Sequence, residues 1–368
     1  MRKVFLLFLM TVFILTGSYA GAESTVGKIL DQVKVKGFVS AGYNYNFNTP
    51  DSKAINFRPF NNKDNSFNLE LAGLVFEKEA SAPGDAGFRI DLDYGFTIPE
   101  QIRSTGLSLE SDQFDLRQAY VRWVAPVGNG LTLDFGKFIT EMGAEVIEGA
   151  DGWNYNYSRS LLFYYTIPFT HTGLRASYTP NDYVSFVAAV VNGWDNVVDN
   201  NSAKSFLIHA AITPTKTTTV NLKYIVGAER DDNNRDLRHV VNVNFTQEFL
   251  EKFTFNLDLV YGSEDSAVVV NETATWSGVS GIIRYAVNDM IALNLRGEFL
   301  DDNDGSRTGT KQQMWEFTFT PEFAVSKNII IRPEYRHDAS DSKVFDKDNI
   351  LADSKTQDTV GINVLFYF

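Results

Sequence analysis

The sequence predicts an all-β fold, a closed transmembrane antiparallel β-barrel of about sixteen strands (about fourteen to eighteen), behind an N-terminal signal peptide. Three observations lead to this fold. Apolar and polar residues alternate over segments long enough to cross a bilayer, which needs roughly nine to eleven residues per strand. Short and long connections take turns along the chain, and aromatic residues gather near both ends of the predicted strands.

The N-terminal residues resemble an export signal. Two basic residues open the chain, an apolar run follows over 4–15, and small residues come next. This pattern predicts a signal peptide over 1–22, and cleavage after Ala20 and cleavage after Ala22 both fit. Residues 23–33 then form a short periplasmic lead. The rest of the chain contains no second apolar run of about eighteen residues, so the exported protein is either soluble or a closed barrel.

The remaining sequence, 34–368, is dominated by a period of two. In 88–98, 253–261 and 291–299, apolar residues occupy one face of the predicted strand and mostly polar residues the other. The predicted strands are 34–47, 66–78, 86–98, 113–125, 131–139, 172–179, 183–192, 203–213, 218–228, 236–248, 253–262, 273–286, 290–300, 311–325, 328–337 and 357–368.

The connections between these strands separate a barrel from a soluble sandwich. Short turns rich in Gly, Pro, Asn or Asp alternate strictly with long loops. The long loops are 48–65, 99–112, 140–171, 193–202, 229–235, 263–272, 301–310 and 338–356. A sandwich has no reason to sort its loops in this way, whereas outer-membrane barrels have short periplasmic turns and long extracellular loops.

Composition excludes several functions. The formal net charge of −13 argues against nucleic-acid binding. The chain has no cysteine, so it forms no disulfide, thiolate metal site or covalent haem attachment. The sequence contains no cofactor motif, and we predict no cofactor, no bound metal and no catalytic residues.

The inward face of the predicted strands is charged. A barrel of about sixteen strands leaves an aqueous channel, and unpaired charges are too costly to bury dry. We therefore predict a water-filled lumen that passes small polar solutes or ions. A lumen plugged by paired charges and folded loops is the alternative. The candidate pore-lining residues of the wall are Arg89, Asp91, Asp93, Arg117, Arg122 and Arg175.

The longest loop, 140–171, is the candidate constriction, because a loop of this length without structure is usually functional. Folded inward, its carboxylates could face wall arginines such as Arg89, Arg117, Arg122 and Arg175 and set ion preference. An outward loop in a lid or at a protomer contact is the alternative. The carboxylates are Glu141, Glu145, Glu148 and Asp151.

Several motifs resemble the OmpL-like β-barrel porin family. The similarity is densest over 131–200 and is carried by Gly136-Lys137-Phe138, Gly143-Ala144-Glu145, Asn156 to Phe163, Ile167 to Arg175 and Val191 to Asp195. It implies a porin of the bacterial outer membrane, surrounded by outer-membrane lipid, and brings no established catalytic or binding residues. Porins of this size are often homotrimers. The C-terminal Phe366 and Phe368 resemble the signal that the barrel-assembly machinery recognises.

Three other functions stay open from sequence. A substrate-selective channel for sugars or carboxylates could use Trp153, Tyr155 and Tyr157 as a stacking track. A structural sleeve around an electron-transfer partner would need that partner to bring its own haem. An outer-membrane enzyme would have to use one of four histidines, and no neighbouring residues in sequence define a triad, which is recognised by geometry.

Overall fold

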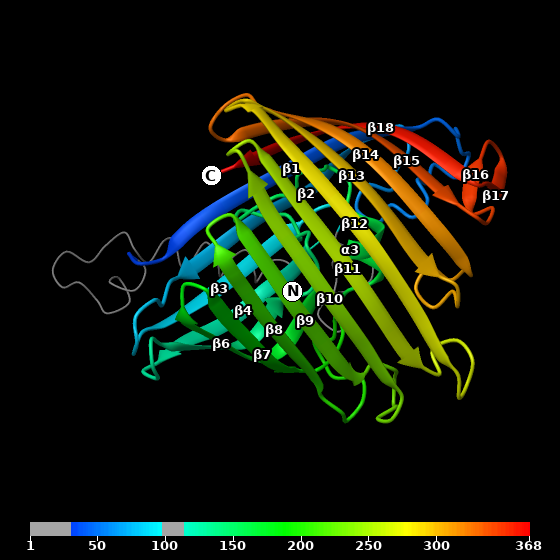
Figure 1. Cartoon of the computed structure of the whole chain (residues 1–368). Coiled ribbons are helices and arrows are strands. Elements are labelled where there is room, and N and C mark those ends of the chain that lie inside the picture. Colours follow the sequence, from blue (N-terminus) through cyan, green and yellow to red (C-terminus); the bar gives the residue numbers. More distant parts are fainter. Residues whose placement is uncertain (1–30, 98–113) are drawn as a thin grey trace, which may run out of the picture. The chain divides into compact units, whose positions relative to one another are not determined.

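The computed structural model describes residues 31–97 and 114–368. Within these residues sixteen strands close into one antiparallel barrel, in the order β1-β18-β15-β14-β13-β12-β11-β10-β9-β8-β7-β6-β5-β4-β3-β2 (Figure 1). The predicted signal peptide, most of the predicted lead and the predicted loop 99–112 lie outside the described residues.

The bounds of the wall strands follow the predicted segments closely. They are β1 (Lys34–Asn46), β2 (Ser66–Lys78), β3 (Ala86–Tyr94), β4 (Phe114–Ala125), β5 (Leu131–Ile139), β6 (Thr170–Asn181), β7 (Val184–Val191), β8 (Ser205–Thr215), β9 (Thr218–Ala228), β10 (Leu237–Phe249), β11 (Phe253–Asp265), β12 (Thr273–Asn288), β13 (Ile291–Asp302), β14 (Gln312–Ala324), β15 (Ile329–Ser340) and β18 (Thr356–Tyr367).

The barrel closes between its first and last strands. β1 pairs antiparallel with β18, from Phe38 opposite Tyr367 to Asn46 opposite Thr359. Because the barrel is closed, the backbone N–H and C=O groups of each wall strand can bond to a neighbouring strand. A sheet inside a membrane needs this pairing, since hydrocarbon offers no hydrogen-bond partners. The predicted all-β, closed antiparallel barrel of sixteen strands is confirmed.

The structure differs from the sequence prediction at three places. β3 ends at Tyr94 rather than at 98, because the regular ladder gives way there to an irregular bond from Phe96 N to Leu69 O (3.1 Å). The loop predicted over 140–171 contains a short helix, α3 (Leu161–Tyr165). The loop predicted over 338–356 contains a small hairpin of β16 (Phe345–Lys347) and β17 (Ile350–Ser354).

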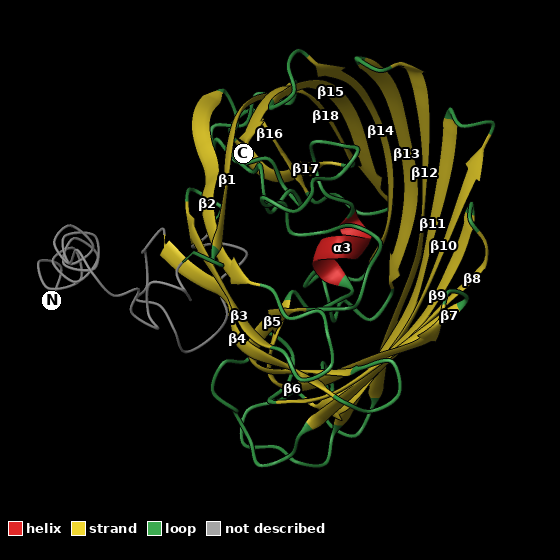
Figure 2. Cartoon of the chain, turned by 90° about the vertical axis from the view of Figure 1, so that its left-hand side faces the viewer, coloured by secondary structure: helices red, strands yellow, loops and turns green. Residues whose placement is uncertain are grey.

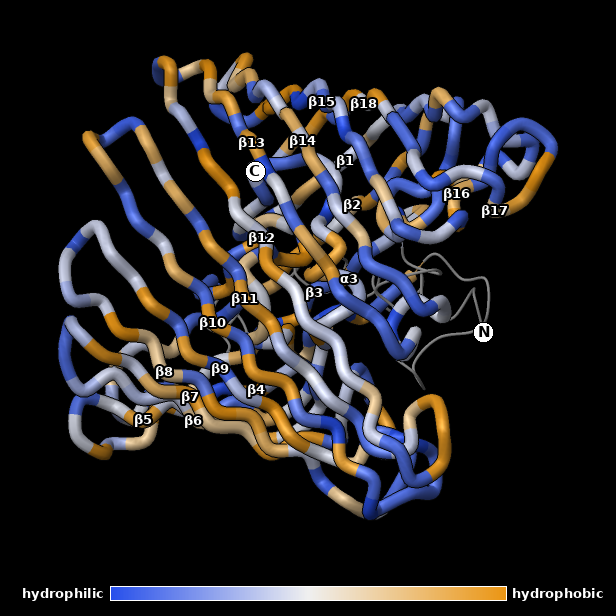
Figure 3. Tube along the Cα trace, turned by 45° about the vertical axis from the view of Figure 1, so that its right-hand side comes forward, coloured by the Kyte–Doolittle hydropathy of each residue, from blue (hydrophilic) through white to orange (hydrophobic). Residues whose placement is uncertain are grey.

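The two faces of the wall differ in polarity, as the alternating colours along strands such as β13 and β14 show (Figure 3). Large apolar side chains such as Phe67 and Phe135 are 85% and 70% exposed on the outside. Arg296, Arg332 and Arg336 point inward and are at most 1% exposed. The outer face of such a sheet is apolar enough to contact lipid, and the inner face is not. Separately, the described helices include none with the length and hydropathy to cross a membrane.

Loops occupy part of the barrel interior. Figure 2 shows α3 and the chain around it enclosed by the ring of strands. The loop after β1 joins the small hairpin, since Asp346 N donates to Asn56 Oδ1 (2.8 Å). Phe57 of this loop packs against Phe345 and against Tyr165 of α3, with ring centroids 5.7 and 6.1 Å apart. Side chains therefore fill the interior where the loop after β1, the β16–β17 hairpin and α3 meet.

Candidate constriction inside the barrel

The inner segment, residues 140–169 between β5 and β6, folds into the lumen around α3. Ser160 caps this helix, because its hydroxyl accepts from Phe163 N at 3.0 Å. The Glu298 carboxylate on the wall accepts from the two preceding amides, Leu161 N at 2.7 Å and Leu162 N at 3.3 Å. These two bonds satisfy N–H groups that have no partner within the helix at its start, so the wall itself holds the start of α3.

Other wall oxygens bind backbone N–H groups of the inner segment. Glu334 accepts from Tyr157 N (2.7 Å) and Ser158 N (3.0 Å). Asn242 accepts from Gly143 N at 2.8 Å, and Asp258 accepts from Ala144 N at 3.2 Å. The amide oxygen of Asn242 is a neutral acceptor, whereas hydrogen bonds to the carboxylates of Glu334 and Asp258 are about twice as strong as neutral ones. Together these contacts fix the backbone path of the segment.

Wall arginines bind the carbonyl groups of the same segment. Arg296 donates to Ser158 O, Arg332 to Asn154 O and Arg336 to Arg159 O, each at 2.6 Å. Arg117, on β4, donates to Glu148 O at 2.7 Å. The wall therefore satisfies both the donors and the acceptors of a loop that has little secondary structure of its own.

The four predicted carboxylates of the inner segment all contact basic residues, and two of these are among the predicted arginines. Glu141 accepts from Arg175 Nη1 at 2.8 Å, and Asp151 pairs with Arg89. Glu145 pairs with Arg296 at 3.0 Å. Glu148 pairs with Arg332 at 2.8 Å and with Arg159 at 3.1 Å.

The expected contact of Arg122 with loop carboxylates is not formed, because the register places Arg122 opposite Asp134, whose carboxylate it binds at 2.7 Å. Arg117 also pairs within the wall, with Asp93 at 3.1 Å and Asp91 at 3.3 Å. Asp91 and Asp93 are at most 1% exposed. They lie in a buried ion-pair network rather than on an open surface.

Burial and charge both act on the titration of the inner segment. Burial alone would raise the pKa of Glu148, but the guanidinium groups of Arg159 and Arg332 outweigh it and hold that pKa below its usual value. Burial, and then the neighbouring Glu70 carboxylate, raise the pKa of Tyr157 well above its usual value. Glu148 is therefore a carboxylate and Tyr157 a phenol at neutral pH.

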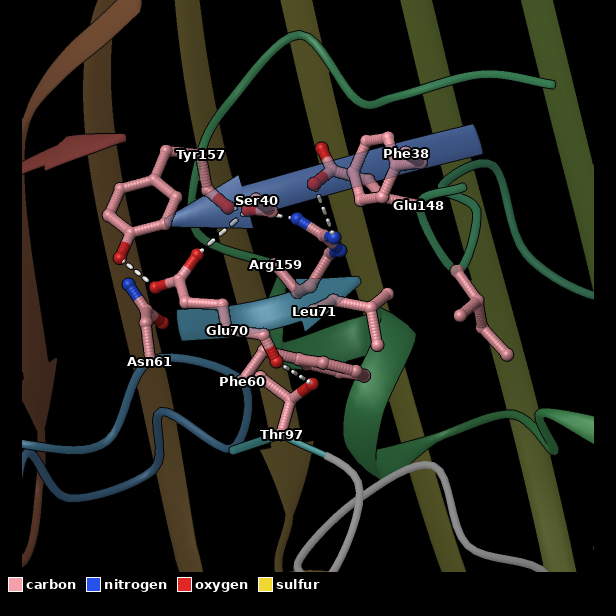
Figure 4. A pocket seen from close by; sticks show the side chains of 11 residues that line it. Phe38, Ser40, Phe60, Asn61, Glu70, Leu71, Thr97, Glu148, Tyr157 and Arg159 are labelled. Atoms are coloured by element: carbon pink, nitrogen blue, oxygen red, sulfur yellow. Dashed lines mark hydrogen bonds and ion pairs between the residues drawn. The ribbon is translucent and has the colours of Figure 1, made fainter. Parts of the chain in front are cut away.

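Tyr157 is not available as a stacking surface, contrary to the sequence expectation. Its hydroxyl donates to Glu70, which also accepts from Ser40 Oγ at 3.1 Å (Figure 4). The cavity beside these residues has a volume of about 20 Å³, close to the space that one water molecule requires. Arg159 and Glu148 also line this cavity, and Figure 4 marks the ion pair between them.

The sequence reasoning missed an apolar contact between the inner segment and the wall. Leu161, Leu162 and Phe163 are at most 3% exposed and belong to one cluster with inward-facing residues of the wall. Those wall residues are Leu207, Ile225, Val240, Val260, Leu300 and Met314. The available signal was a single large apolar residue, Leu207 or Ile225, on the otherwise polar or small-residue face of the predicted strands 203–213 and 218–228.

Two larger cavities also border the inner segment within the described residues. The Asn244 cavity, of about 400 Å³, lies between residues 143–155 and the inward faces of β9 to β12. Its lining reaches Thr246 and Asn256, close to the short turn between β10 and β11, so it lies on the periplasmic side by the loop-length rule. The Arg307 cavity, of about 280 Å³, is lined by α3 and by loop residues including Trp194 and Asp195.

The closed barrel with a loop folded into its lumen defines an outer-membrane channel protein. Its residues 32–368 match the family model described as putative beta-barrel porin-2, OmpL-like. The chain therefore belongs to this porin family of the bacterial outer membrane. No curated protein matches the sequence.

Solved structures show the same fold at low sequence identity. The outer-membrane channel DcaP of Acinetobacter baumannii is 13% identical with a TM-score of 0.62, over 95% of this chain and 100% of that one. The anion-selective porin from Comamonas acidovorans is 8% identical with a TM-score of 0.61, over 91% and 99%. A trimer form of OmpT of Vibrio cholerae is 14% identical with a TM-score of 0.59, over 91% and 99%.

Proposed function

We propose that this porin passes small polar solutes and ions through a lumen that the inner segment narrows to a route along β9 to β12. The observation that carries this proposal is the division of the lumen. On one side the inner segment is bonded to β13, β14 and β15, and on the other the Asn244 cavity borders β9 to β12. Pore size is therefore set by the segment and not by the strand number alone.

The charges of the wall on β3, β4 and β6, which lie outside the lining of the Asn244 cavity, set the ion preference of the pore. Arg89, Arg122 and Arg175 keep side chains on the inward face of the wall, and Glu141 and Asp151 of the inner segment face two of them. Fixed opposite charges in a narrow passage produce a transverse field that acts on ions and dipolar solutes. No catalytic role is part of this proposal.

The remaining features of the proposal concern assembly. Residues 1–22 act as the signal peptide, Phe366 and Phe368 are read by the barrel-assembly machinery, and the barrel is a homotrimer. Phe366 and Phe368 are 42% and 57% exposed, with rings 6.0 Å apart on the outer face, where a recognition factor can reach them. The trimer is supported by the trimer form of the similar OmpT structure.

Planar-bilayer recording of a shortened variant tests the constriction. Replacing residues 144–165 with a short Gly-Ser linker should raise single-channel conductance several-fold and admit larger solutes in liposome swelling. The matched control shortens the exposed loop between β11 and β12, which lies outside the inner segment, and should leave conductance unchanged. Equal conductance of both variants and the parent would contradict the proposal.

A further inference from the structure

The strongest unassigned feature of the lumen is the set of amide side chains around the Asn244 cavity. The cavity has a volume of about 400 Å³, within the range of small-molecule sites. Asn221, Asn244 and Asn256 line it from three adjacent strands, β9, β10 and β11. Thr246 adds a hydroxyl. The wall of the cavity thus offers both donors and acceptors without a formal charge on these four groups.

Asn244 has an unused acceptor at this place. It is 4% exposed, and its Nδ2 donates to Asp258 Oδ1 at 2.7 Å. That bond fixes the orientation of the amide, and Oδ1 then has no hydrogen-bond partner in the described part of the chain. A buried oxygen left without a partner costs free energy, which a bound hydroxyl group would recover.

Asn221 and Asn256 add unused donors. Asn221 Oδ1 lies 2.9 Å from His209 Nε2, and its amide nitrogen makes no hydrogen bond within residues 31–97 and 114–368. Asn256, half-buried, has neither amide atom bonded within those same residues. These groups are therefore free to bind a ligand or water.

The charged groups near the cavity already compensate one another. Lys223 donates to Gly143 O at 2.7 Å and lies near the Asp258 carboxylate, which accepts from Ala144 N and from two asparagine amides. Glu145 is held by Arg296 at 3.0 Å. A charged ligand would find no spare counter-charge here, whereas a neutral ligand needs none.

Two aromatic rings of the inner segment complete the lining. Trp153 packs against Tyr367 with centroids 4.7 Å apart, and the Arg284 guanidinium lies 4.8 Å from the Tyr155 ring. Each ring is braced from one side while it lines the cavity. Rigid aromatic surfaces beside amide groups suit a ligand with an apolar ring face and hydroxyl groups at its edge.

We propose that the Asn244 cavity is a weak binding site for neutral polyhydroxylated solutes, such as pyranose sugars, on their way through the pore. This inference rests on the proposed channel function and specifies its substrate class. Binding in a channel must be strong enough to favour entry and weak enough to allow exit, so a site of neutral hydrogen bonds is appropriate.

Current block by maltose tests the site. Added to one side of a bilayer containing the full-length pore, maltose should reduce the ion current in a saturable way. Asn244→Leu and Asn256→Leu should each raise the half-blocking concentration about tenfold, measured relative to the open current of the same variant. Asn256→Leu breaks no bond among the described residues, so loss of block there is not a folding effect.

Ser185→Leu is the matched control. It places the same leucine side chain on the inward face of β7 without lining the cavity, and should leave the half-blocking concentration unchanged. Three results would overturn the site. The first is a conducting pore that maltose does not block in a saturable way, and the second is an equal shift of the half-blocking concentration in all three variants. The third is block by succinate and not by maltose, if Lys223→Gln abolishes the succinate block. Absence of any conductance would contradict the channel function instead.

Discussion

Replacing Arg296 with alanine should release the inner segment from the barrel wall. Arg296 is 1% exposed and joins three groups at once. It donates to Ser158 O at 2.6 Å, and it pairs with Glu145 of the segment and with Glu316 of the wall, both at 3.0 Å. Its side chain is thus the direct link between a loop carboxylate, a loop carbonyl and β14.

The size of the effect follows from these contacts. Alanine would leave Glu145 and Glu316 buried without this counter-charge, and removing one partner of a buried ion pair costs about 3–5 kcal/mol. Since about 1.4 kcal/mol is a factor of ten in an equilibrium, the ratio of docked to undocked segment should fall by a factor on the order of 10² to 10⁴. The barrel ladder does not depend on this side chain, so the wall should still form.

Single-channel recording measures the result directly. Arg296→Ala should show a larger mean conductance than the parent and frequent transitions between two current levels. Arg230→Ala is the control, because Arg230 pairs with Asp236 within the loop between β9 and β10 and contacts no carboxylate of the segment. If folded Arg296→Ala, verified by heat-modifiable mobility, shows the parental current without added transitions, the docking argument is wrong.

Three further predictions concern charge, pH and assembly. Arg117→Glu and Arg122→Glu should shift the reversal potential in a salt gradient toward cation preference, and unchanged potentials would refute their part in selectivity. Because docking lowers the pKa of Glu148, the contribution of this carboxylate to docking is complete above 4.5, its ordinary pKa, and is lost as pH falls through the lowered pKa. Two-level currents should therefore appear in the parent pore at acidic pH. A Glu148→Gln pore should show them already at neutral pH, without a further change on acidification. Deleting Phe368 should reduce the amount of folded, heat-modifiable protein in the outer membrane, whereas normal insertion would exclude its role as an assembly signal.

The wall could be predicted from sequence because its rules are local. A strand whose residues alternate between lipid and lumen carries the period of two in its own letters, and β2, β5 and β9 have the predicted bounds. β3 is shorter than predicted because the irregular bond at Phe96 replaces the ladder, and a single strand pattern does not reveal the register of its neighbour.

The contacts of the inner segment could be predicted only in part, because its partners lie far apart in the chain. Inward folding and the pairs Glu141–Arg175 and Asp151–Arg89 connect the segment to nearby strands. The bonds to Arg296 and Arg332 span more than 130 residues. Nothing in the local sequence specifies which inward arginine meets a given loop carbonyl.

The same contacts change how a charged lumen should be interpreted. Many inward charges were expected to require water, yet Arg296, Arg332 and Arg336 are nearly fully buried and are satisfied by the carboxylates and carbonyls around them. Paired charges in a barrel therefore mark the places where a loop is fastened. Water and solutes are better sought where inward polar groups keep unused hydrogen-bonding capacity. In the described wall that condition is met at the amide-lined cavity along β9 to β11, and the diffusion route should follow it.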